Sequence, residues 1–302
     1  MRASVIIAIM LLVQGASPSF IYRVKAAQYS VFDYPGNSCL SFDGTNDYAN
    51  CSGSNAFNVT KLTFEAWVKL NYTIAPGSNG IYGHEWGCIV QHRPALAPED
   101  ARYYGWFVAF NYARGHLNFA LGTQSSYVEF DSLKSLWDPI WYHIAVTYDR
   151  TLESGNVKFY VNEILDSQFD EYRPIVYASS PLHVGLQHGV FAYFGLIDEA
   201  RLWNTTRTGL ELNDTMLRIL SPSEAADPNL VGYWSLDEGT GSTSQDKSTY
   251  GNTLVLPVTP ANPQWVSPGA PIIPEFSSFL ILPLFMIVTL LAVIVHKRKH
   301  PV

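Results

Sequence analysis

The sequence predicts an all-β chain, an antiparallel sandwich of two sheets, with a signal segment before it and one transmembrane helix after it. Two observations carry the prediction of the sandwich. Apolar and polar residues alternate in several short runs, and turn residues separate these runs at intervals of roughly 8–15 residues. The 302 residues also contain 21 Gly and 18 Pro but only 15% charged residues, which favours short strands and turns.

Residues 1–19 are predicted to be a secretory signal peptide. Arg2 precedes an uncharged apolar run from Val5 to Val13, and small and polar residues follow up to Ser19. A run of this length is too short to cross a hydrocarbon core of ~30 Å. An uncleaved N-terminal anchor is the alternative.

The alternating runs that we expect to form strands follow in order along the chain. In Leu62–Leu70 the side chains of Phe64, Ala66 and Val68 share one face. Similar runs occupy residues 106–110, 117–121, 142–148, 157–161, 182–185 and 230–236. Between them, Thr208 and Glu211 match a capping box, so one helix is expected to begin near residue 209. Residues 74–104 are expected to form a long loop, because they contain several Gly and Pro.

The C-terminal part is predicted to be a membrane anchor. Residues 257–276 include six prolines and form a semi-rigid spacer. Residues 277–296 are uncharged up to the last position and long enough for a transmembrane helix, and residues 297–302 form a basic cytoplasmic tail. Basic residues stay on the cytoplasmic side, so the domain is expected on the extracellular face of the cell membrane.

Charge and glycosylation motifs agree with an exported chain. The net charge of −7 argues against a nucleic-acid partner. Five Asn-x-Ser/Thr sequons favour a glycosylated surface. They begin at Asn50, Asn58, Asn71, Asn204 and Asn213.

Two of the three cysteines are candidates for a disulfide bond. Cys39 and Cys51 are equidistant from Thr45, the centre of a turn-like stretch. If residues 39–51 form a hairpin, the two sulfur atoms lie opposite each other and can bond in an oxidising compartment. Two buried thiols are the alternative, and Cys88 is then either buried or paired with one of the others.

Four motifs, taken in order, resemble the laminin-G-like jelly roll of the concanavalin A-like lectin/glucanase and pentraxin-like group. They are SFDGTNDY (41–48) with LTFEAWVKL (62–70), WYHIAVTYD (141–149) with VKFYVN (157–162), FGLIDEARLWN (194–204), and NLVGYWSLDEGTG (229–241). The resemblance implies one domain of two packed antiparallel sheets, which we place at residues 34–256.

The tail resembles the PEF-type sorting signals of archaeal surface proteins. Pro274-Glu275-Phe276 precedes the apolar run and the basic cluster. The resemblance implies cleavage near this motif and transfer to another anchor. A retained single membrane span is the alternative.

Acidic residues near both ends of the domain suggest a structural calcium ion. Asp43, Asn46 and Asp47 offer hard oxygen ligands in a tight turn, and Asp237 lies in the closing strands. First and last strands are commonly neighbours in a jelly roll, so these residues can converge. The alternative is that Asp43 and Asp47 bind backbone amides of the turn. Asp198 is expected to have a structural role, paired with Arg201 or with backbone amides.

Aromatic residues in and after the long loop are the candidate ligand-binding residues, namely Tyr82, Trp86, Tyr103 and Tyr104. Their rings can stack on sugars or fill interface pockets. The E-x-D-x-x-E run of related glucanases is missing, so catalysis is not expected. The sequence thus predicts a surface protein that binds a glycan or a surface glycoprotein. The alternatives are a structural envelope protein with protein partners and a glycosidase of the same fold.

Overall fold

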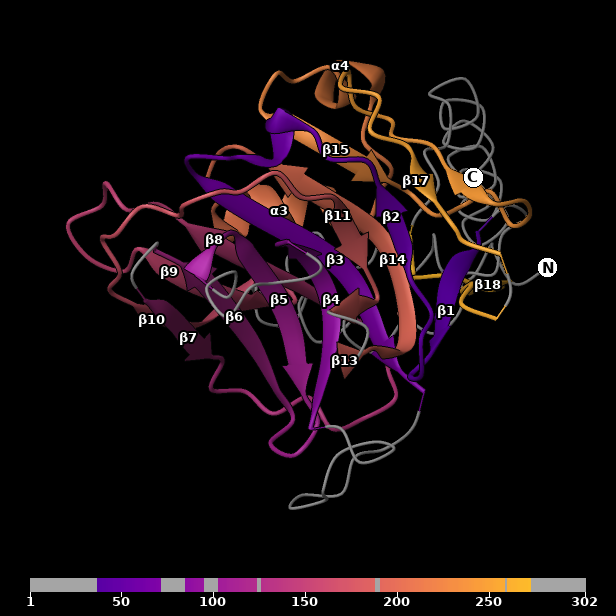
Figure 1. The fold of residues 1–302 in the computed structure, drawn as a ribbon, viewed down its shortest axis with the longest axis horizontal. Coiled ribbons are helices and arrows are strands. Elements are labelled where there is room, and N and C mark those ends of the chain that lie inside the picture. Colours follow the sequence, from indigo (N-terminus) through magenta and orange to yellow (C-terminus); the bar gives the residue numbers. More distant parts are fainter. Residues whose placement is uncertain are drawn as a thin grey trace, which may run out of the picture. The chain divides into compact units, whose positions relative to one another are not determined.

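Two antiparallel sheets packed face to face form the fold (Figure 1). The computed structural model describes residues 37–71, 85–94, 103–123, 126–187, 191–258 and 260–272. All of them belong to one unit that ends at Ile272. The predicted all-β sandwich is confirmed.

Sheet A has eight strands. Their hydrogen-bonded order is β10 (Ile164–Phe169), β9 (Val157–Val161), β8 (Tyr142–Tyr148), β3 (Leu62–Leu70), β14 (Phe194–Trp203), β1 (Cys39–Asp43) and β18 (Gln264–Val266). The eighth strand, β15 (Leu230–Trp234), also pairs with β14. The first and last strands, β1 and β18, are therefore neighbours, although β18 lies in the segment that was predicted to be a spacer.

Sheet B has ten strands. Their order is β16 (Thr243–Ser244), β17 (Leu254–Val255), β2 (Ala49–Cys51), β11 (Leu182–Val184), β4 (Trp86–His92), β5 (Trp106–Asn111), β6 (His116–Gly122) and β7 (Tyr127–Asp131). Two short strands, β12 (Leu186–Gln187) and β13 (Phe191–Ala192), pair with each other, and β13 also pairs with β4.

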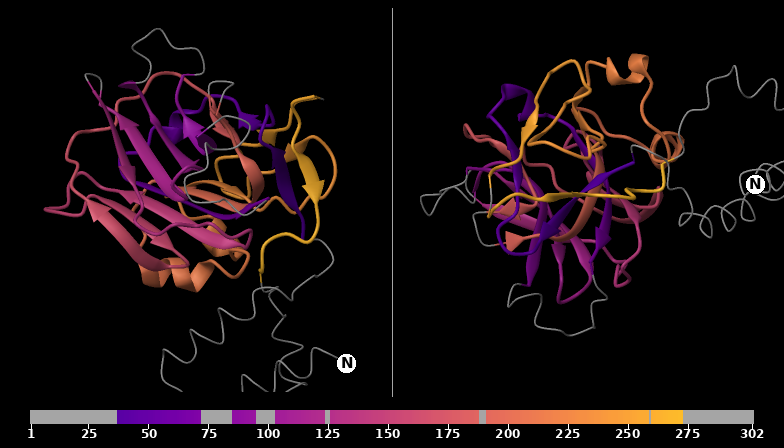
Figure 2. Two further views of the ribbon diagram at one scale, coloured as in Figure 1. Left: turned by 90° about the horizontal axis from the view of Figure 1, so that it is seen from below. Right: turned by 90° about the vertical axis from the view of Figure 1, so that its right-hand side faces the viewer.

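Short helices lie outside the sheets. The predicted capping box is confirmed, because Thr208 and Glu211 bond reciprocally at the start of α3 (Gly209–Thr215). A second capping box, between Ser221 and Glu224, begins α4 (Pro222–Ala225). A 3-10 turn, η1 (Asn55–Phe57), follows β2. Figure 2 shows α3 on the side of sheet A that faces away from sheet B.

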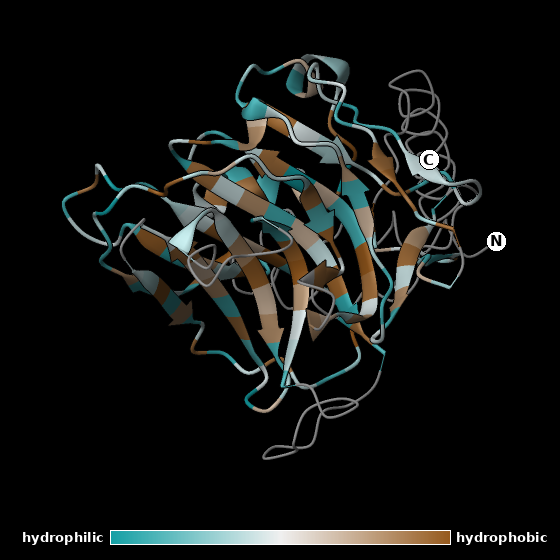
Figure 3. Cartoon of the chain, in the orientation of Figure 1, coloured by the Kyte–Doolittle hydropathy of each residue, from teal (hydrophilic) through white to brown (hydrophobic). Residues whose placement is uncertain are grey.

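The hydrophobic core lies between the two sheets and takes alternate residues from each strand. Phe64, Ala66 and Val68 of β3 point into it and are at most 4% exposed. Figure 3 shows the resulting alternation of hydropathy along the strands. Burying one such large side chain contributes about 1.5–3 kcal/mol. The predicted inward face of β3 is confirmed.

Several strands were missed in the sequence, and β4 is the longest of them. β4 lies inside the stretch predicted to be a loop, and both of its faces are covered by other groups. A strand that is buried on both sides lacks the alternation on which the prediction depends.

The C-terminal boundary of the predicted domain is wrong. Residues 257–276 were expected to form a spacer, but β18 pairs with β1, and Ala270 and Ile272 are buried against Trp67. The domain therefore continues to Ile272, because these apolar residues cover an otherwise exposed part of sheet A.

The predicted Cys39–Cys51 hairpin and its disulfide are also wrong. Cys39 lies in sheet A and Cys51 in sheet B, because the turn between β1 and β2 leads from one sheet to the other. All three cysteines are free and buried. Burial raises the pKa of Cys51 to about 12, which keeps its thiol protonated and unreactive.

The membrane segments predicted from the sequence lie outside the described residues. This holds for the signal peptide at 1–19, the helix at 277–296 and the tail at 297–302. Within the described part of the chain, no helix has the length and apolar character needed to cross a membrane.

Candidate functional site

The side of sheet B that points away from the core carries the candidate site. We call it the sheet B face, defined by the outward side chains of β4 to β7. Strand register places them in rows, with Gln91 next to Phe107, Phe107 next to Ala120, and Ala120 next to Glu129. The next row contains Cys88, Ala109, Asn118 and Asp131.

The floor of this face is apolar and made largely of small side chains. Cys88, Ala109 and Ala120 are fully buried there with Phe107, while Trp86 and Tyr127 are partly exposed at its borders. The rings of Phe107 and Tyr127 stack with centroids 6.2 Å apart.

Arg93 lies over this aromatic pair. Its guanidinium carbon is 5.2 Å from the centroid of Phe107 and 5.2 Å from that of Tyr127. Burial lowers the pKa of Arg93, and its environment includes the Tyr127 hydroxyl. The Tyr127 hydroxyl in turn donates to Glu129. An aromatic face that attracts a cation can also attract a ligand.

Three polar atoms on the sheet B face have no hydrogen-bond partner among the described residues. They are Gln91 Oε1, Asn118 Oδ1 and Arg93 Nε, on side chains that are 1%, 1% and 3% exposed. The amide nitrogens are occupied, because Gln91 Nε2 donates to Leu186 O (3.2 Å) and Asn118 Nδ2 donates to Asp131 Oδ1 (2.9 Å). Each amide is therefore fixed with its oxygen left over. Buried polar atoms are rarely left so in folded proteins.

The predicted aromatic cluster is only partly assembled. Trp86 belongs to the sheet B face, whereas Tyr82 lies outside the described residues. Tyr103 and Tyr104 are half-buried, and their backbone packs against Gly122. Trp86 lies opposite Asn111, the last residue of β5. Tyr103 packs on Gly122, which lies beside the first residue of β5. Tyr103 and Trp86 are therefore at opposite ends of β5, roughly 17 Å apart.

Sequence reasoning missed Gln91, Arg93, Phe107, Asn118 and Tyr127. One signal was available for Phe107, because the run WFVAF in β5 is apolar at every position rather than at alternate positions. A strand with apolar side chains on both sides is usually covered by other groups on both sides. The unpaired amide oxygens have no such signal, because their pairing depends on neighbours far away in the sequence.

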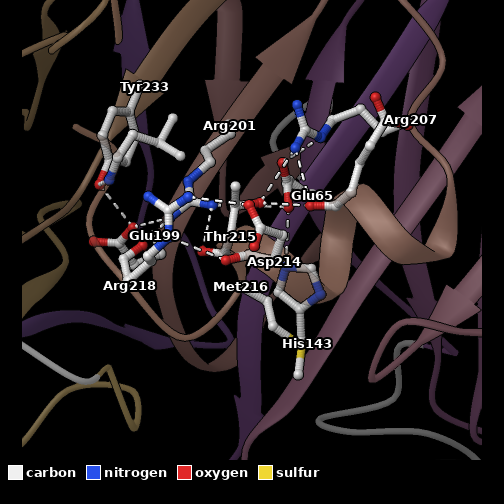
Figure 4. A network of polar contacts seen from close by, with 12 residues as sticks. Glu65, His143, Glu199, Arg201, Arg207, Asp214, Thr215, Met216, Arg218 and Tyr233 are labelled. Carbon is white, nitrogen blue, oxygen red and sulfur yellow. Dashed lines mark hydrogen bonds and ion pairs between the residues drawn. The ribbon is translucent and has the colours of Figure 1, made fainter. Parts of the chain in front are cut away.

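The outward side of sheet A carries a network of paired charged residues (Figure 4). We call this surface the sheet A face. Glu65 accepts from His143 Nε2 (3.1 Å) and from Trp203 Nε1 (2.8 Å). Arg201 donates to Glu199 (2.6 Å) and to the backbone oxygen of Thr215 (3.1 Å).

These contacts attach the helical segment to sheet A. Burial would raise the pKa of Glu65, but the hydrogen bond from His143 and the charges of Arg201 and Arg207 lower it to about 2. Leu212 of α3 packs on Ala145 and Tyr160. The network therefore has a structural role.

Asp198 also has the structural role that was predicted. It accepts from the backbone N–H groups of Glu199 (2.9 Å) and Ala270 (2.7 Å), while Arg201 pairs with Glu199 instead. A β-bulge in β14 and a positive φ of 49° at Glu199 turn the carboxylates of Asp198 and Glu199 to the side of sheet A that faces away from the core. Burial and the neighbouring Glu199 raise the pKa of Asp198 well above its usual value.

The predicted calcium ligands do not converge. Asp43 Oδ1 accepts from the backbone of Thr45 (2.8 Å) and Asn46 (3.4 Å), and Asp47 Oδ2 accepts from the backbone of Asp43 (2.9 Å). These are the turn bonds of the alternative interpretation.

Asp237 lies elsewhere, with a backbone hydrogen bond from Ser38. Five residues of extended chain separate Ser38 from Asp43, roughly 16 Å. Burial, with Glu199 nearby, raises the pKa of Asp237 to about 7. No cluster of three or more His, Cys, Asp or Glu that suits a metal ion occurs in the described ranges.

The five predicted glycosylation sites differ in their surroundings. Asn58 and Asn71 are exposed, and Asn50 is half-buried on β2. Asn204 Oδ1 accepts from the backbone of Thr60 (2.9 Å), and Asn213 Oδ1 is buried. Asn58 and Asn71 are therefore the best placed for a glycan, and glycosylation at each of the five stays a prediction.

Comparison with solved structures agrees with this fold. A protein from Bacteroides ovatus, which has been proposed to bind carbohydrate, superposes with a TM-score of 0.52 at 18% identity. The superposition covers 76% of this chain and 58% of that chain. The pentraxin of Limulus polyphemus gives 0.41 at 14% identity, covering 60% of this chain and 82% of that one. The sialidase CBM40 of Ruminococcus gnavus, bound to α2,3-sialyllactose, gives 0.43 at 11% identity, covering 57% and 95%.

Sequence comparison gives the family. No curated protein matches the whole sequence significantly. Residues 43–213, more than half of the chain, match the family described as the concanavalin A-like lectin/glucanases superfamily. The order of the strands, the two-sheet architecture and this match agree, and the chain belongs to the concanavalin A-like lectin/glucanases superfamily.

Proposed function

We propose that this chain is a membrane-anchored cell-surface protein that binds a glycan, or the glycan of a glycoprotein, on the sheet B face. The observation that carries the proposal is the set of unpaired buried atoms, Gln91 Oε1, Asn118 Oδ1 and Arg93 Nε, beside aromatic rings. Sugar hydroxyls donate and accept hydrogen bonds, and the C–H faces of sugar rings stack on aromatic side chains. The Bacteroides ovatus protein of the same fold, itself proposed to bind carbohydrate, is in keeping with this function.

Binding requires the face to open. Phe107 is only 4% exposed, and Arg93 covers its ring. Trp86 and Tyr127 are partly exposed and offer the first contacts. We expect the ligand to displace Arg93 from the Phe107 ring and to use its Nε as a hydrogen-bond donor.

The test is binding of the purified full-length protein to a glycan array, with calcium and with EDTA. Wild type is expected to bind a defined glycan class, and Gln91→Met to lose that binding. Gln264→Met is the matched control, because Gln264 is exposed on β18 of sheet A. Binding that survives Gln91→Met would contradict the proposed face.

A glycosidase is the second candidate, because Glu129 and Asp131 both face outward from β7. Two positions along a strand correspond to ~7 Å, within the spacing of glycosidase carboxylates. Asp131, however, is paired with Arg114 (3.3 Å) and Asn118. Glycan release that Glu129→Gln abolishes would establish an enzyme, and binding without turnover would favour a lectin.

A structural envelope protein with protein partners is the third candidate. Such a protein would bind no glycan on the array, but a pull-down from envelope fractions would recover a defined partner. That outcome would replace the glycan proposal.

A further inference from the structure

Two amide oxygens on the sheet B face, Gln91 Oε1 and Asn118 Oδ1, lie on different strands and lack a hydrogen-bond partner among the described residues. Gln91 of β4 lies opposite Phe107 of β5. Phe107 lies opposite Ala120 of β6, and Asn118 is two residues from Ala120 on the same strand. Two strand spacings of ~4.8 Å and two residues of ~3.4 Å separate the backbones of Gln91 and Asn118 by roughly 12 Å. The two oxygens therefore offer a ligand two separate contact points.

The side chains of Gln91 and Asn118 do not shorten this separation. Gln91 Nε2 donates to the backbone oxygen of Leu186 (3.2 Å), and Leu186 follows β11, which pairs with β4 on the side away from β5. Asn118 Nδ2 donates to Asp131 Oδ1 (2.9 Å) on β7, which pairs with β6 on the side away from β5. Both side chains therefore lean away from the strand that lies between them.

The distance between the two oxygens sets the minimum length of a ligand that reaches both. Each of the two side chains is 1% exposed, so hydrogen bonds from a ligand run down into the face rather than along it. A six-membered sugar ring with bonds of ~1.5 Å holds its most distant hydroxyl oxygens about 6 Å apart. One ring is therefore too short, and two linked rings are the shortest sugar that reaches both oxygens.

The path between the two oxygens is apolar. It crosses β5 between Phe107 and Ala109, which belong to the buried cluster on this face. The Phe107 ring offers a surface on which a sugar ring can stack once Arg93 is displaced. The path therefore suits the ring faces of a sugar chain, with polar contacts at its two ends.

The polarity and charge of the face favour a neutral ligand. An amide oxygen only accepts hydrogen bonds, so the ligand must donate at both points, as hydroxyl groups do and carboxylate or sulfate groups do not. Arg114 pairs with Asp131 (3.3 Å), and Arg93 lies over the ring of Tyr127, whose hydroxyl donates to Glu129. Two positive and two negative side chains balance, so no excess positive charge attracts an acidic sugar.

We propose that the sheet B face binds a neutral glycan of at least two linked sugar rings, which lies obliquely across β4, β5 and β6. One hydroxyl of this glycan donates to Gln91 Oε1, and a hydroxyl of another ring donates to Asn118 Oδ1. The proposal rests on the function proposed above, and it adds the length, the direction and the charge of the ligand.

The first experiment measures how binding depends on glycan length. The purified full-length protein is applied to an array of mono-, di- and trisaccharides of glucose, galactose, mannose and N-acetylglucosamine, with disaccharides of glucuronic and galacturonic acid beside them. Disaccharides and trisaccharides of at least one neutral series are expected to bind at least about tenfold more tightly than the monosaccharide. The acidic disaccharides are expected to bind more weakly than their neutral counterparts.

The second experiment removes the two contact points one at a time. Gln91→Met and Asn118→Leu are each expected to weaken binding of the best disaccharide or trisaccharide at least about tenfold, because each removes one acceptor. Asn229→Leu is the matched control and should bind as wild type does. Asn229 is exposed before β15 of sheet A, and its Nδ2 donates to Asp227 (3.1 Å) as that of Asn118 does to Asp131.

Three results would overturn the proposal and leave the proposed function in place. They are equal binding of monosaccharides and disaccharides, tighter binding of the acidic disaccharides, and unchanged binding by Asn118→Leu when Gln91→Met has lost it. No binding of any sugar on the array would remove both the proposal and the function on which it rests. If Asn118→Leu does not fold, the length series with wild type decides alone.

Discussion

The outward charged side chains of the sheet A face pair with one another and are covered by α3, whereas the sheet B face keeps two amide oxygens, Gln91 Oε1 and Asn118 Oδ1, without a partner among the described residues. The atoms of the sheet A network that lack a partner there are nitrogens of side chains held by other bonds, such as His143 Nδ1. Both faces bury large apolar side chains, as Trp203 and Phe107 illustrate. Within the described residues, the sheet A face is therefore an internal contact, and the sheet B face offers acceptors to the ligand that we propose.

The largest effect is expected on the sheet A face. Glu65→Ala should lower the free energy of unfolding by about 3–5 kcal/mol, because it leaves the buried side chains of His143 and Trp203 without their acceptor. Urea denaturation measures this loss. Glu129→Gln, an exposed change on the sheet B face, is the control and should stay within about 0.5 kcal/mol of wild type. A loss below about 1 kcal/mol for Glu65→Ala would mean that the network is not what attaches the helix.

The second effect is a loss of stability in mild acid that does not involve the sheet A network. Burial lowers the pKa of His92 from 6.5 to about 4. The unfolded chain then takes up a proton below pH 6.5 and the folded chain does not. The contribution of His92 to stability is complete above pH 6.5 and falls by about 3 kcal/mol as the pH drops to 4, while Asp237, whose pKa is raised to about 7, contributes in the opposite direction.

Urea denaturation of wild type and His92→Gln across that pH range isolates the contribution of His92, because Asp237 is present in both proteins. Wild type should lose about 3 kcal/mol more than His92→Gln between pH 6.5 and 4. The Glu65 network keeps its contribution down to about pH 4.5, because the pKa of Glu65 is about 2 and its stability is lost only below its unfolded value of 4.5. Parallel curves for the two proteins from pH 6.5 to 4.5 would contradict the burial of a neutral His92.

The third prediction is a small change in the free energy of unfolding together with a large loss of glycan affinity. Gln91→Met replaces an amide whose oxygen is unpaired by an apolar side chain of similar length. The free energy of unfolding should change by no more than about 1 kcal/mol, because the lost bond to Leu186 is offset by removal of the unpaired oxygen. Glycan affinity should fall at least about tenfold. A large loss of stability instead would place Gln91 in the same structural class as Glu65.

The smallest effect concerns the cysteines. Dithiothreitol should leave Tm unchanged within error, because Cys39, Cys51 and Cys88 are free. Peptide mapping without reduction checks the same point. A Cys39–Cys51 peptide would show that the two strands pair in a way that the present sheets exclude.

The central strands β3 and β8 of sheet A could be predicted because apolar and polar side chains alternate in them. Leu62–Leu70 and Tyr142–Tyr148 begin and end at the predicted residues, and the α3 cap depends only on residues three apart. β4 could not be predicted in this way, because its two buried faces remove the alternation.

The candidate site was harder to predict because it combines residues from different strands. The sequence pointed to Trp86. It did not show that Gln91 and Asn118 keep an unpaired oxygen.

Wild type, Gln91→Met and Gln264→Met, compared on one glycan array, test whether a glycan completes the sheet B face. We expect wild type and Gln264→Met to bind the same glycan class, while Gln91→Met folds with a free energy of unfolding within about 1 kcal/mol of wild type but does not bind. Equal binding by all three proteins would contradict the proposal.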